Sequence, residues 1–494
     1  MFAVVNMSLT WTLLCSLFWA ACSRIIYLVY FHPLAKYPGP FLAKLTPFWN
    51  VFVVASGNRH VIFAALHEKH GDFVRIAPNA VIIRHVSAQR DLHSFGSQVV
   101  KSDGYIAARL EPEMSSLVDE QDPVKHSQMR KHVSPAFSTR ALEGMEQYIK
   151  SSIDRFTDNI KIYGKDGTIP LNMTAWCSML TFDILSDLSY GETFGMVEKG
   201  EALPLLKIIE WAVKGIAVGM AIPPSLVKFA PYIMPKALLK GRDDLTNETL
   251  KKLKKRIGNP SGRKDLFTYM EKLANVEETD ADRESRLNTI GHVFLVAGGD
   301  SISGFLTSTM YYILKTPRVY RKLYEEVSSA FSSKEDITAS QASHLKYVSA
   351  VIEEGLRICL PIPGDLARKT LNPTMIAGRM FPAGIDLSAS NWAMSRDERY
   401  FTAPNEFIPE RWIDPLFERD QTLGKTAVLP FSQGPRMCIG VNLAYMEMRM
   451  TLAQWVLELD CQLVEPDVPY ITQDYFAAAK PILMIKSKPR VRMP

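Results

Sequence analysis

The chain has 494 residues, of which 47% are apolar and 22% are charged, so it can bury a large core and does not have the composition of a disordered protein. Its formal net charge of +5 is small for this length, and the sequence contains no dense Lys/Arg stripe interleaved with aromatic residues, which argues against nucleic-acid binding. The cysteines have no paired spacing, which argues against a disulfide framework or a zinc site: Cys15, Cys22, Cys177, Cys359, Cys438 and Cys461.

The amino-terminal segment, residues 1–31, is predicted to be a transmembrane anchor. No Asp, Glu, Lys or Arg occurs from Met1 to Ser23, and the apolar character continues to Phe31, which is enough to cross a bilayer at about 20 residues. A cleaved signal peptide would carry basic residues before its apolar core, whereas here Arg24 comes after it. Positive charge on the downstream side places the rest of the chain in the cytosol. The alternative is a buried core helix.

Behind the anchor, residues 32–45 are predicted to be a hinge and residues 46–494 a single large domain. Pro38, Gly39 and Pro40 cannot continue a helix and indicate a stiff connection. The domain is mostly helical in pattern, with short β-type runs such as "FVRIAP", "AVIIRHV" and "TMIAGRMFPAG". The expected fold class is therefore mainly α with a minor β-sheet.

Two further segments bear on the organisation of the domain. Residues 204–235 are very apolar but interrupted by proline, and they form either a buried helix pair or a surface patch that dips into lipid. Residues 251–286 are charged and turn-rich, which indicates a surface connection rather than a domain boundary.

The stretch "FSQGPRMCIG", residues 431–440, places one cysteine ahead of an apolar helical run. Cys438 is therefore expected at a helix amino terminus, where the helix dipole and free N–H groups favour a thiolate. Gly434 and Gly440 allow close backbone approach, as a large flat ligand requires, and Arg436 supplies a cation for a carboxylate. This is the chemistry of a haem site. The alternatives are an inert core cysteine and a hydrolytic nucleophile, although no histidine lies near this segment in the sequence.

These residues carry a resemblance to the cytochrome P450 family. The signature F-x-x-G-x-R-x-C-x-G is matched at every fixed position by Phe431, Gly434, Arg436, Cys438 and Gly440. The resemblance covers nearly the whole body of the chain. It implies the P450 fold, a haem b cofactor whose iron takes Cys438 as its axial thiolate, and cofactor contacts from the other four residues.

Two other motifs resemble the structural network of the same family. In "VIEEGLR", Glu354 and Arg357 are three residues apart and share one helix face. In "FIPERW", Arg411 resembles the third member of a buried Glu–Arg–Arg network that stabilises the fold around the cysteine loop.

The stretch "FLVAGGDSISG" resembles the family's helix on the oxygen-binding side of the haem. Ala297 and Gly298 are expected to contact the cofactor, and Gly298 and Gly299 to weaken the helix and open a groove for dioxygen. Asp300 and Ser301 resemble an acid–alcohol pair that relays protons. The family usually has threonine where this chain has Ser301, which keeps the hydroxyl and loses the methyl group that restricts its rotamer.

The resemblance also supplies partners for the haem propionates. His126 and Arg130 are four residues apart on one helix face in "PVKHSQMRKHVSPAFS", and both can donate to a carboxylate. Arg368, in "PIPGDLARKT", resembles the strand arginine that reaches the same carboxylates.

The sequence as a whole is similar to fungal microsomal members that tailor secondary metabolites. We therefore expect a monooxygenase in the endoplasmic reticulum membrane that hydroxylates, epoxidises or oxidatively couples a bulky, mostly apolar molecule. No flavin or dinucleotide fingerprint is present, so electrons would come from NADPH-cytochrome P450 reductase, docked near Arg130 and Lys131. The alternatives are a same-fold haem enzyme that rearranges or dehydrates its substrate without dioxygen, and a non-enzymatic haem-binding membrane protein. The expected pocket segments are residues 105–117, 209–218, 294–302 and 361–366.

Overall fold

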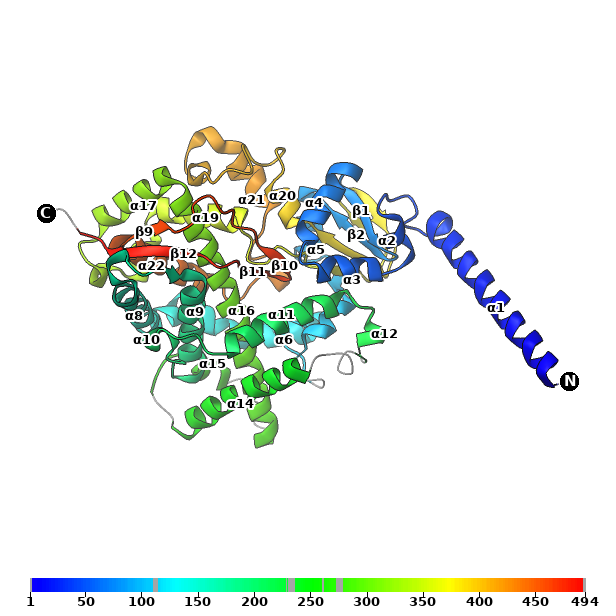
Figure 1. Cartoon of the computed structure of the whole chain (residues 1–494), viewed down its shortest axis with the longest axis horizontal. Helices are drawn as coiled ribbons and strands as arrows, with labels where there is room; N and C mark the ends of the chain where they lie inside the picture. The colour runs from blue at the N-terminus through cyan, green and yellow to red at the C-terminus, as the bar shows by residue number, and fades with distance from the viewer. Residues whose placement is uncertain are drawn as a thin grey trace.

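The body of the molecule has a sheet-containing region next to the amino-terminal helix and a larger helical region beyond it (Figure 1). This arrangement confirms the expected mainly α fold with minor β structure. The computed structural model describes residues 2–109, 114–227, 229, 236–259, 262–271 and 279–491.

The first helix, α1 (Phe2–Ile26), projects away from the body and continues into a π-helical turn, η1 (Tyr27–Phe31) (Figure 1). The apolar span Trp11–Phe31 is only 6% buried, and its side chains, such as Trp19, face outward. Within the described chain, a second span, Asp282–Lys315, has a comparable composition, but it is 61% buried and belongs to a core helix. The contrast argues against the buried-core alternative for the first segment and is compatible with a membrane anchor.

The segment expected to be a hinge, residues 32–45, packs against the body. Leu34 and Tyr37 have almost no exposed surface, and the Tyr37 ring stacks on phenylalanine rings from two strands. A side chain on Gly39 would lie 2.1 Å from the carbonyl oxygen of Arg75, so the close approach of the two backbones requires glycine there. Core contacts, and not proline stiffness alone, therefore hold this connection in place.

The main sheet has the strand order β1-β2-β8-β5-β3, with β2 and β8 parallel and the other pairs antiparallel. Helices α2, α3 and α4 contact β1, and α5 contacts β8. The β3–β5 register places Lys101 directly opposite Arg368. The bounds are β1 (Phe73–Ala77), β2 (Ala80–Ile83), β3 (Val99–Lys101), β5 (Arg368–Thr370), β8 (Asp386–Ala389), α2 (Phe41–Leu45), α3 (Phe48–Ala55), α4 (Arg59–His70) and α5 (Val86–His93).

Smaller sheets lie in and beside the helical region. Strands β9 (Leu459–Leu463), β12 (Met484–Pro489) and β4 (Leu171–Asn172) form one of them, with β12 in the centre. The run "TMIAGRMFPAG" forms the antiparallel pair β6 (Thr374–Ile376) and β7 (Arg379–Phe381), and a second pair consists of β10 (Gln473–Tyr475) and β11 (Ala477–Ala479). The strands predicted from "FVRIAP", "AVIIRHV" and "TMIAGRMFPAG" are confirmed.

Helices make up most of the remaining described chain. Short 3₁₀ or π turns connect several of them: η2 (Asp103–Ala108), η3 (Ser134–Phe137), η4 (Lys165–Gly167), η5 (Lys334–Asp336), η6 (Pro409–Trp412), η7 (Pro415–Phe417), η8 (Asp420–Gly424) and η9 (Gly434–Arg436). The helices are α6 (Pro123–Val133), α7 (Thr139–Glu143), α8 (Glu146–Gly164), α9 (Met173–Tyr190), α10 (Met196–Lys199), α11 (Leu205–Ala221), α12 (Pro224–Val227), α14 (Lys236–Gly258), α15 (Leu266–Glu271), α16 (Asp280–Lys315), α17 (Pro317–Ala330), α18 (Ala339–Ser343), α19 (Lys346–Ile358), α20 (Asn391–Ser395), α21 (Lys425–Ala427) and α22 (Val441–Glu458).

The long helix α16 runs through the helical region and contacts α9, α14, α19 and α22 (Figure 1). Leu295, Phe305, Leu306 and Met310 have no exposed surface. A helix that is apolar on several faces is stable only when neighbours cover those faces. The segment that resembles the oxygen-side helix of a P450 therefore lies in the core.

A capping interaction fixes the start of α6. The Asp122 carboxylate accepts hydrogen bonds from two backbone N–H groups of the first turn, at 2.7 and 3.2 Å, and Pro123 occupies the first helical position. Because the helix starts there, His126 and Arg130 lie one turn apart on one face.

The described part of residues 204–235 consists of α11 and α12, and residues 228 and 230–235 lie outside the described residues. α11 buries Ile209 and Ala217 but leaves Trp211 63% exposed. The segment is therefore not a fully buried helix pair, and contact with lipid stays a prediction.

Residues 251–286 differ from the surface connection that their charge predicted. Their first part belongs to α14, and α15 buries Leu266, Phe267 and Met270 in the main core. The charged pattern did not reveal the short apolar helix α15, and it did not mark exposed positions throughout, since Asp265 is fully buried.

Candidate functional site

Cys438 lies between η9 and the start of α22. Its backbone N–H donates to the carbonyl oxygen of Phe431 at 2.8 Å, which closes the loop. A side chain on Gly434, whose φ is +69°, would lie 2.1 Å from the backbone oxygen of His93, so close packing on α5 requires this glycine. A side chain on Gly440 would meet only an ordinary contact with a nearby ring, at 3.8 Å. The close approach at Gly434 is therefore a contact between two backbone segments of the protein, and not with a ligand.

The Cys438 thiol is accessible and at the same time surrounded by protein atoms. Its side chain has substantial accessible surface, yet burial is the main influence on its pKa and raises it, while the Gly440 N–H and Arg130 lower it less. The sulfur is therefore accessible although protein atoms surround it. Burial therefore opposes the effect expected from the helix amino terminus, and a bound metal cation would favour the thiolate.

Ala297, near the middle of α16, is also exposed. Its neighbours Phe294, Leu295 and Ile302 are buried, so Ala297 also faces a space inside the protein. The Phe294 ring packs edge-on against Phe137, with 5.3 Å between centroids, and Phe137 lies beside the cysteine loop. Accessible interior surface thus occurs on α16 and on the cysteine loop in the same part of the molecule.

Five basic side chains gather beside this loop: Lys101, His126, Arg130, Arg368 and Arg436. Burial, followed by the four other cations, lowers the pKa of His126 to about 3. Burial and Arg368 lower the pKa of Arg436 to about 10. Burial lowers the pKa of Lys101 well below its usual value, with Arg436 and Arg368 adding to the effect. The sequence analysis named four of these residues, and the structure brings those four together.

Four of these side chains, all except His126, donate to backbone oxygens. Within the described chain, none of the five forms an ion pair with a carboxylate. Clustered, partly buried basic side chains whose nearest carboxylates stay beyond ion-pair distance raise the free energy of the fold, so the cluster fits a ligand with more than one carboxylate, as haem has. The bonds run from Arg436 to the carbonyls of Glu120 and Gln121 (2.7 and 2.9 Å), from Lys101 to those of Leu117 and Val118 (2.7 and 2.8 Å), from Arg130 to that of Met437 (2.6 Å) and from Arg368 to that of Ala367 (3.1 Å).

Two residues of this region were missed by the sequence analysis. Lys101 faces Arg368 across the β3–β5 pair, and like charges in directly opposite positions destabilise a sheet unless a counter-charge is present. His93 is buried, and its Nδ1 atom has no hydrogen-bond partner. Burial, with Arg368, lowers the pKa of His93 to about 3. Strand pairing and the packing of α5 bring these residues to the site, so no local motif identifies them.

Asp300 and Ser301, the expected acid–alcohol pair, contact different partners and are not hydrogen-bonded to each other through the bonds described below. The Ser301 hydroxyl donates to the carbonyl oxygen of Ala297, one turn earlier, at 2.6 Å. The Asp300 carboxylate forms an ion pair with Lys480, which follows β11, at 2.6 Å. The sequence analysis did not identify Lys480, because it lies 180 residues away from Asp300 in the chain.

Gly298 and Gly299 have a packing role in the structure. A side chain on Gly298 would lie 2.9 Å from Leu185 of α9, and one on Gly299 would lie 2.9 Å from the ring of Phe182. The hydroxyl of Thr181 also donates to the carbonyl oxygen of Gly299 at 2.8 Å. The glycines therefore let α9 approach α16, and the dioxygen groove expected from them stays a prediction.

Glu354, Arg357 and Arg411 meet in the core and are essentially unexposed. The Glu354 carboxylate accepts from Arg357 at 2.8 and 2.9 Å and from Arg411 at 3.0 Å. Burial would raise the pKa of Glu354, but the two guanidinium groups hold it below its usual value. Trp412 donates to Glu354 at 3.0 Å, and Arg411 also pairs with Asp420, two partners that the motif did not predict.

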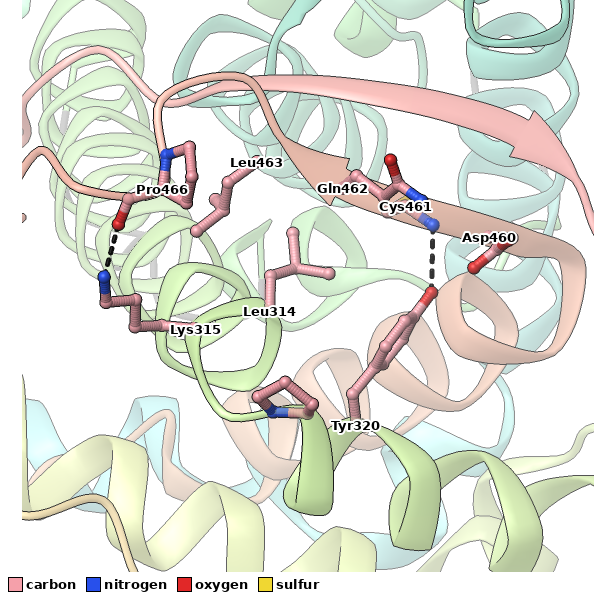
Figure 2. A pocket seen from close by; sticks show the side chains of 9 residues that line it. Leu314, Lys315, Tyr320, Asp460, Cys461, Gln462, Leu463 and Pro466 are labelled. Carbon is pink, nitrogen blue, oxygen red and sulfur yellow. Dashed lines mark hydrogen bonds between the residues drawn. The ribbon is translucent and has the colours of Figure 1, made fainter.

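A separate hollow of about 550 Å³ lies where α16 and α17 meet β9 (Figure 2). The Tyr320 hydroxyl accepts from the backbone N–H of Cys461 at 2.9 Å, and Lys315 donates to the carbonyl oxygen of Pro466. None of the residues that line this hollow belongs to the predicted site. This hollow is therefore not assigned to the predicted site.

Comparisons with known proteins agree with this geometry. The family model "Cytochrome P450" matches residues 38–487. The chain belongs to the cytochrome P450 family. It is 32% identical over 482 residues to the cytochrome P450 monooxygenase astJ of Aspergillus oryzae, with 94% of each chain covered. It is 29% identical over 473 residues to the trichothecene C-15 hydroxylase of Fusarium sporotrichioides, covering 94% of this P450 and 95% of the relative.

The fold agrees as well. The heme domain of cytochrome P450DA superposes with a TM-score of 0.75 at 19% identity, covering 92% of this chain and 97% of the other. This P450 is accordingly an oxidoreductase of the monooxygenase type. The family implies a haem-thiolate iron cofactor, a redox partner and a small-molecule substrate.

Proposed function

We propose that Cys438 is the axial ligand of haem b iron in this P450, and that the enzyme hydroxylates, epoxidises or oxidatively couples a bulky, mostly apolar molecule of fungal secondary metabolism. The supporting observation is the accessible Cys438 thiol, surrounded by protein atoms and lying beside five basic side chains that form no ion pair with a carboxylate in the described chain. Haem with an axial thiolate supplies the activation of dioxygen for transfer of one oxygen atom.

The residues around the cysteine divide the remaining work of binding. Arg130, Arg368 and Arg436 would neutralise the propionates, and His126 and Lys101 would add two further hydrogen-bond donors. Phe431, Gly434, Gly440, Ala297 and Gly298 would line the faces of the ring. Glu354, Arg357 and Arg411 serve the fold, because removal of one partner would leave a buried charge unpaired.

Asp300 and Ser301 are proposed to hold and deliver protons. Ser301 already presents its hydroxyl beside the accessible surface of Ala297, one turn earlier on α16. Asp300 forms an ion pair with Lys480 and keeps part of its side chain exposed to solvent, from which it would take up protons. This pair favours dioxygen chemistry over rearrangement or dehydration, which needs no such proton supply.

The proposed substrate surface is mostly apolar. It comprises the described parts of residues 105–117, 209–218, 294–302 and 361–366, and residues 110–113 lie outside the described residues. Asp365 is a polar exception: its Oδ2 atom has no hydrogen-bond partner, and burial raises its pKa to about 7. A substrate with one hydroxyl or amine group on an apolar framework would suit this surface.

The proposed setting is the endoplasmic reticulum membrane, with α1 as a single-pass anchor and the catalytic domain in the cytosol. Electrons would come from NADPH-cytochrome P450 reductase. The basic stretch Arg130–His132 at the end of α6 lies close to the cysteine loop, which supports docking of an acidic partner on that side.

Labelled dioxygen tests this function. Membranes that contain the protein and the reductase are supplied with NADPH, ¹⁸O₂ and an organic extract of the host organism. We expect a metabolite that gains one labelled oxygen atom, or loses hydrogen through coupling, only when NADPH and dioxygen are both present. A product formed without either of them would favour the rearranging or dehydrating enzyme, and the absence of any product with a bound haem would favour the non-enzymatic haem protein.

A further inference from the structure

Lys480 holds Asp300 from the carboxy-terminal part of the chain. The Lys480 Nζ atom lies 2.6 Å from Asp300 Oδ1 and 2.8 Å from the hydroxyl oxygen of Ser303. Ser303 in turn donates to the backbone carbonyl of Asp300 at 3.0 Å. The aliphatic part of the Lys480 side chain lies along α16, where its Cδ atom is 3.7 Å from the position that a Cβ atom on Gly304 would occupy. Lys480 is thus fixed at its stem and at its charged end.

Asp300 and Lys480 lie at the inner end of a small cleft between α11, α16 and the β10–β11 pair, elements that lie close together in Figure 1. Glu210 and Lys214 of α11 line the outer part and form an ion pair of 2.8 Å. The exposed fraction falls inward, from 52% for Glu210 to 26% for Lys214, then to 16% for Asp300 and 10% for Lys480. The cleft therefore has charged side chains both at exposed and at nearly buried positions.

The β10–β11 pair that forms one wall is fastened through the middle residue of each strand. Asp474 accepts two hydrogen bonds from Arg59 of α4, at 2.7 and 2.9 Å. The Ala478 N–H donates to the carbonyl oxygen of Pro361 at 2.9 Å. Lys214 lies 5.2 Å from the centre of the Tyr475 ring, which joins this wall to α11. The position of Lys480 is therefore set by several elements.

We propose that this cleft is the route by which protons reach Asp300, and that Lys480 is the positioning residue that holds the Asp300 carboxylate at its inner end. The inference rests on the proposed function, in which Asp300 delivers protons on the Ser301 side. Each proton that leaves Asp300 is replaced by one from water in the cleft, so the carboxylate returns to its starting charge after every delivery. Without Lys480, the carboxylate loses its fixed position between the cleft and Ser301.

The test compares three variants in the full-length, membrane-bound enzyme. Lys480→Met keeps the stem and removes the charge, Lys480→Arg keeps the charge, and Lys486→Met, at an exposed position on β12, is the matched control. The assay uses the reductase, NADPH and a host extract as the source of substrate. It records product, hydrogen peroxide and the ratio of rates in light and heavy water.

We expect Lys480→Met to lower the product rate about tenfold or more, because a misplaced acid loses much of its roughly hundredfold or larger contribution. Peroxide release and the solvent isotope effect should rise, the haem spectrum and the substrate concentration for half-maximal rate should stay unchanged, and Lys480→Arg should recover most of the rate. In an Asp300→Asn background, Lys480→Met should cause no further loss, since both changes act on the same step.

Two results would overturn the inference. One is a Lys480→Met enzyme with wild-type rate and isotope effect. The other is a loss confined to substrate affinity, or one that adds fully to that of Asp300→Asn, which would make Lys480 a purely structural fastener of the β10–β11 wall. The wild-type enzyme in the same assay separates these results from failure of the proposed function: product formed without NADPH or dioxygen would remove the need for a proton route altogether.

Discussion

Arg130 of α6 donates a hydrogen bond of 2.6 Å from Nη1 to the backbone carbonyl oxygen of Met437, the residue before Cys438. Burial lowers the pKa of Arg130, and the neighbouring Cys438 acts in the opposite direction. One side chain thus belongs to the cation cluster and also anchors the cysteine loop. The cluster and the thiol are therefore coupled parts of one site.

Replacing this arginine should weaken the loop and the cation cluster together. Arg130→Gln should cost about 1.5–3 kcal/mol, the usual worth of a hydrogen bond to a charged group, and should lower the haem content of the purified protein. Arg130→Lys should retain part of the stability and part of the haem content. Lys131→Gln, at an exposed position on the same helix, is the control. Equal haem-to-protein ratios in Arg130→Gln and Lys131→Gln would contradict the assigned role of Arg130.

Glu447 of α22 predicts a specific dependence of stability on pH. It is buried, its Oε2 atom has no partner, and burial raises its pKa from 4.5 to about 8. Between these two values the folded state binds a proton that the unfolded state has lost, so the free energy of unfolding should fall as the pH rises from 4.5 to 8. Glu447→Gln should remove this slope and stabilise the protein at pH 8 by an amount on the order of a few kcal/mol. Urea unfolding across this pH range measures the free energy of unfolding, and Glu465→Gln, at an exposed position, is the control. Parallel pH profiles in wild type and Glu447→Gln would refute the prediction.

Ser301 allows a test of the acid–alcohol pair in both directions. Ser301→Ala removes the hydroxyl that now bonds to Ala297, so reductant should be diverted to peroxide. Ser301→Thr adds the methyl group that restricts the rotamer, and the fraction of reductant that ends in product should rise. Asp300→Asn should lower the product rate roughly a hundredfold or more while the spectrum and substrate binding are retained. The quantity to compare is product formed per NADPH consumed, and equal values in all four enzymes would exclude a role in proton delivery.

A deletion that removes most of the anchor without disturbing the body must end before Leu28, which is buried. Deleting residues 2–22 keeps Leu28, whose carbonyl oxygen accepts from Arg75 at 2.9 Å, and the buried Leu34 and Tyr37. This deletion should release the protein from membranes at least partly and leave the haem spectrum intact. A deletion through residue 37 should instead lose several kcal/mol of stability, because two core side chains are removed. Sedimentation with membranes and thermal unfolding distinguish the two deletions. Unchanged membrane binding after the deletion of residues 2–22 would identify residues 204–235 as the main membrane attachment.

Local patterns were sufficient for the elements whose chemistry is local. The apolar amino terminus, the strand runs "FVRIAP" and "AVIIRHV", and the ten-residue cysteine stretch each contain their own signal within a short window. Glu354 and Arg357 meet because they lie one helical turn apart, and the family motif supplied Arg411. These features could be predicted because few long-range contacts decide them.

The remaining features depend on partners that are distant in the sequence. Lys101 joins the cation cluster through strand pairing with Arg368, and Lys480 reaches Asp300 across 180 residues. The thiolate expected at Cys438 from the helix dipole is opposed by burial, which only the packed structure reveals. Tyr37, expected in a hinge, is a core residue because phenylalanines of two later strands stack on it.

The most direct measurement of the central claim is the spectrum of the reduced protein with carbon monoxide, recorded for wild type, Cys438→Ala and the control Cys461→Ala. Cys461 is buried beside β12, where its thiol contacts Ser487, and it belongs to no part of the proposed site. The account predicts the long-wavelength band of thiolate-ligated haem in wild type and Cys461→Ala, and its loss in Cys438→Ala. Retention of that band in Cys438→Ala would mean that another residue ligates the iron, and would contradict the assignment of the site.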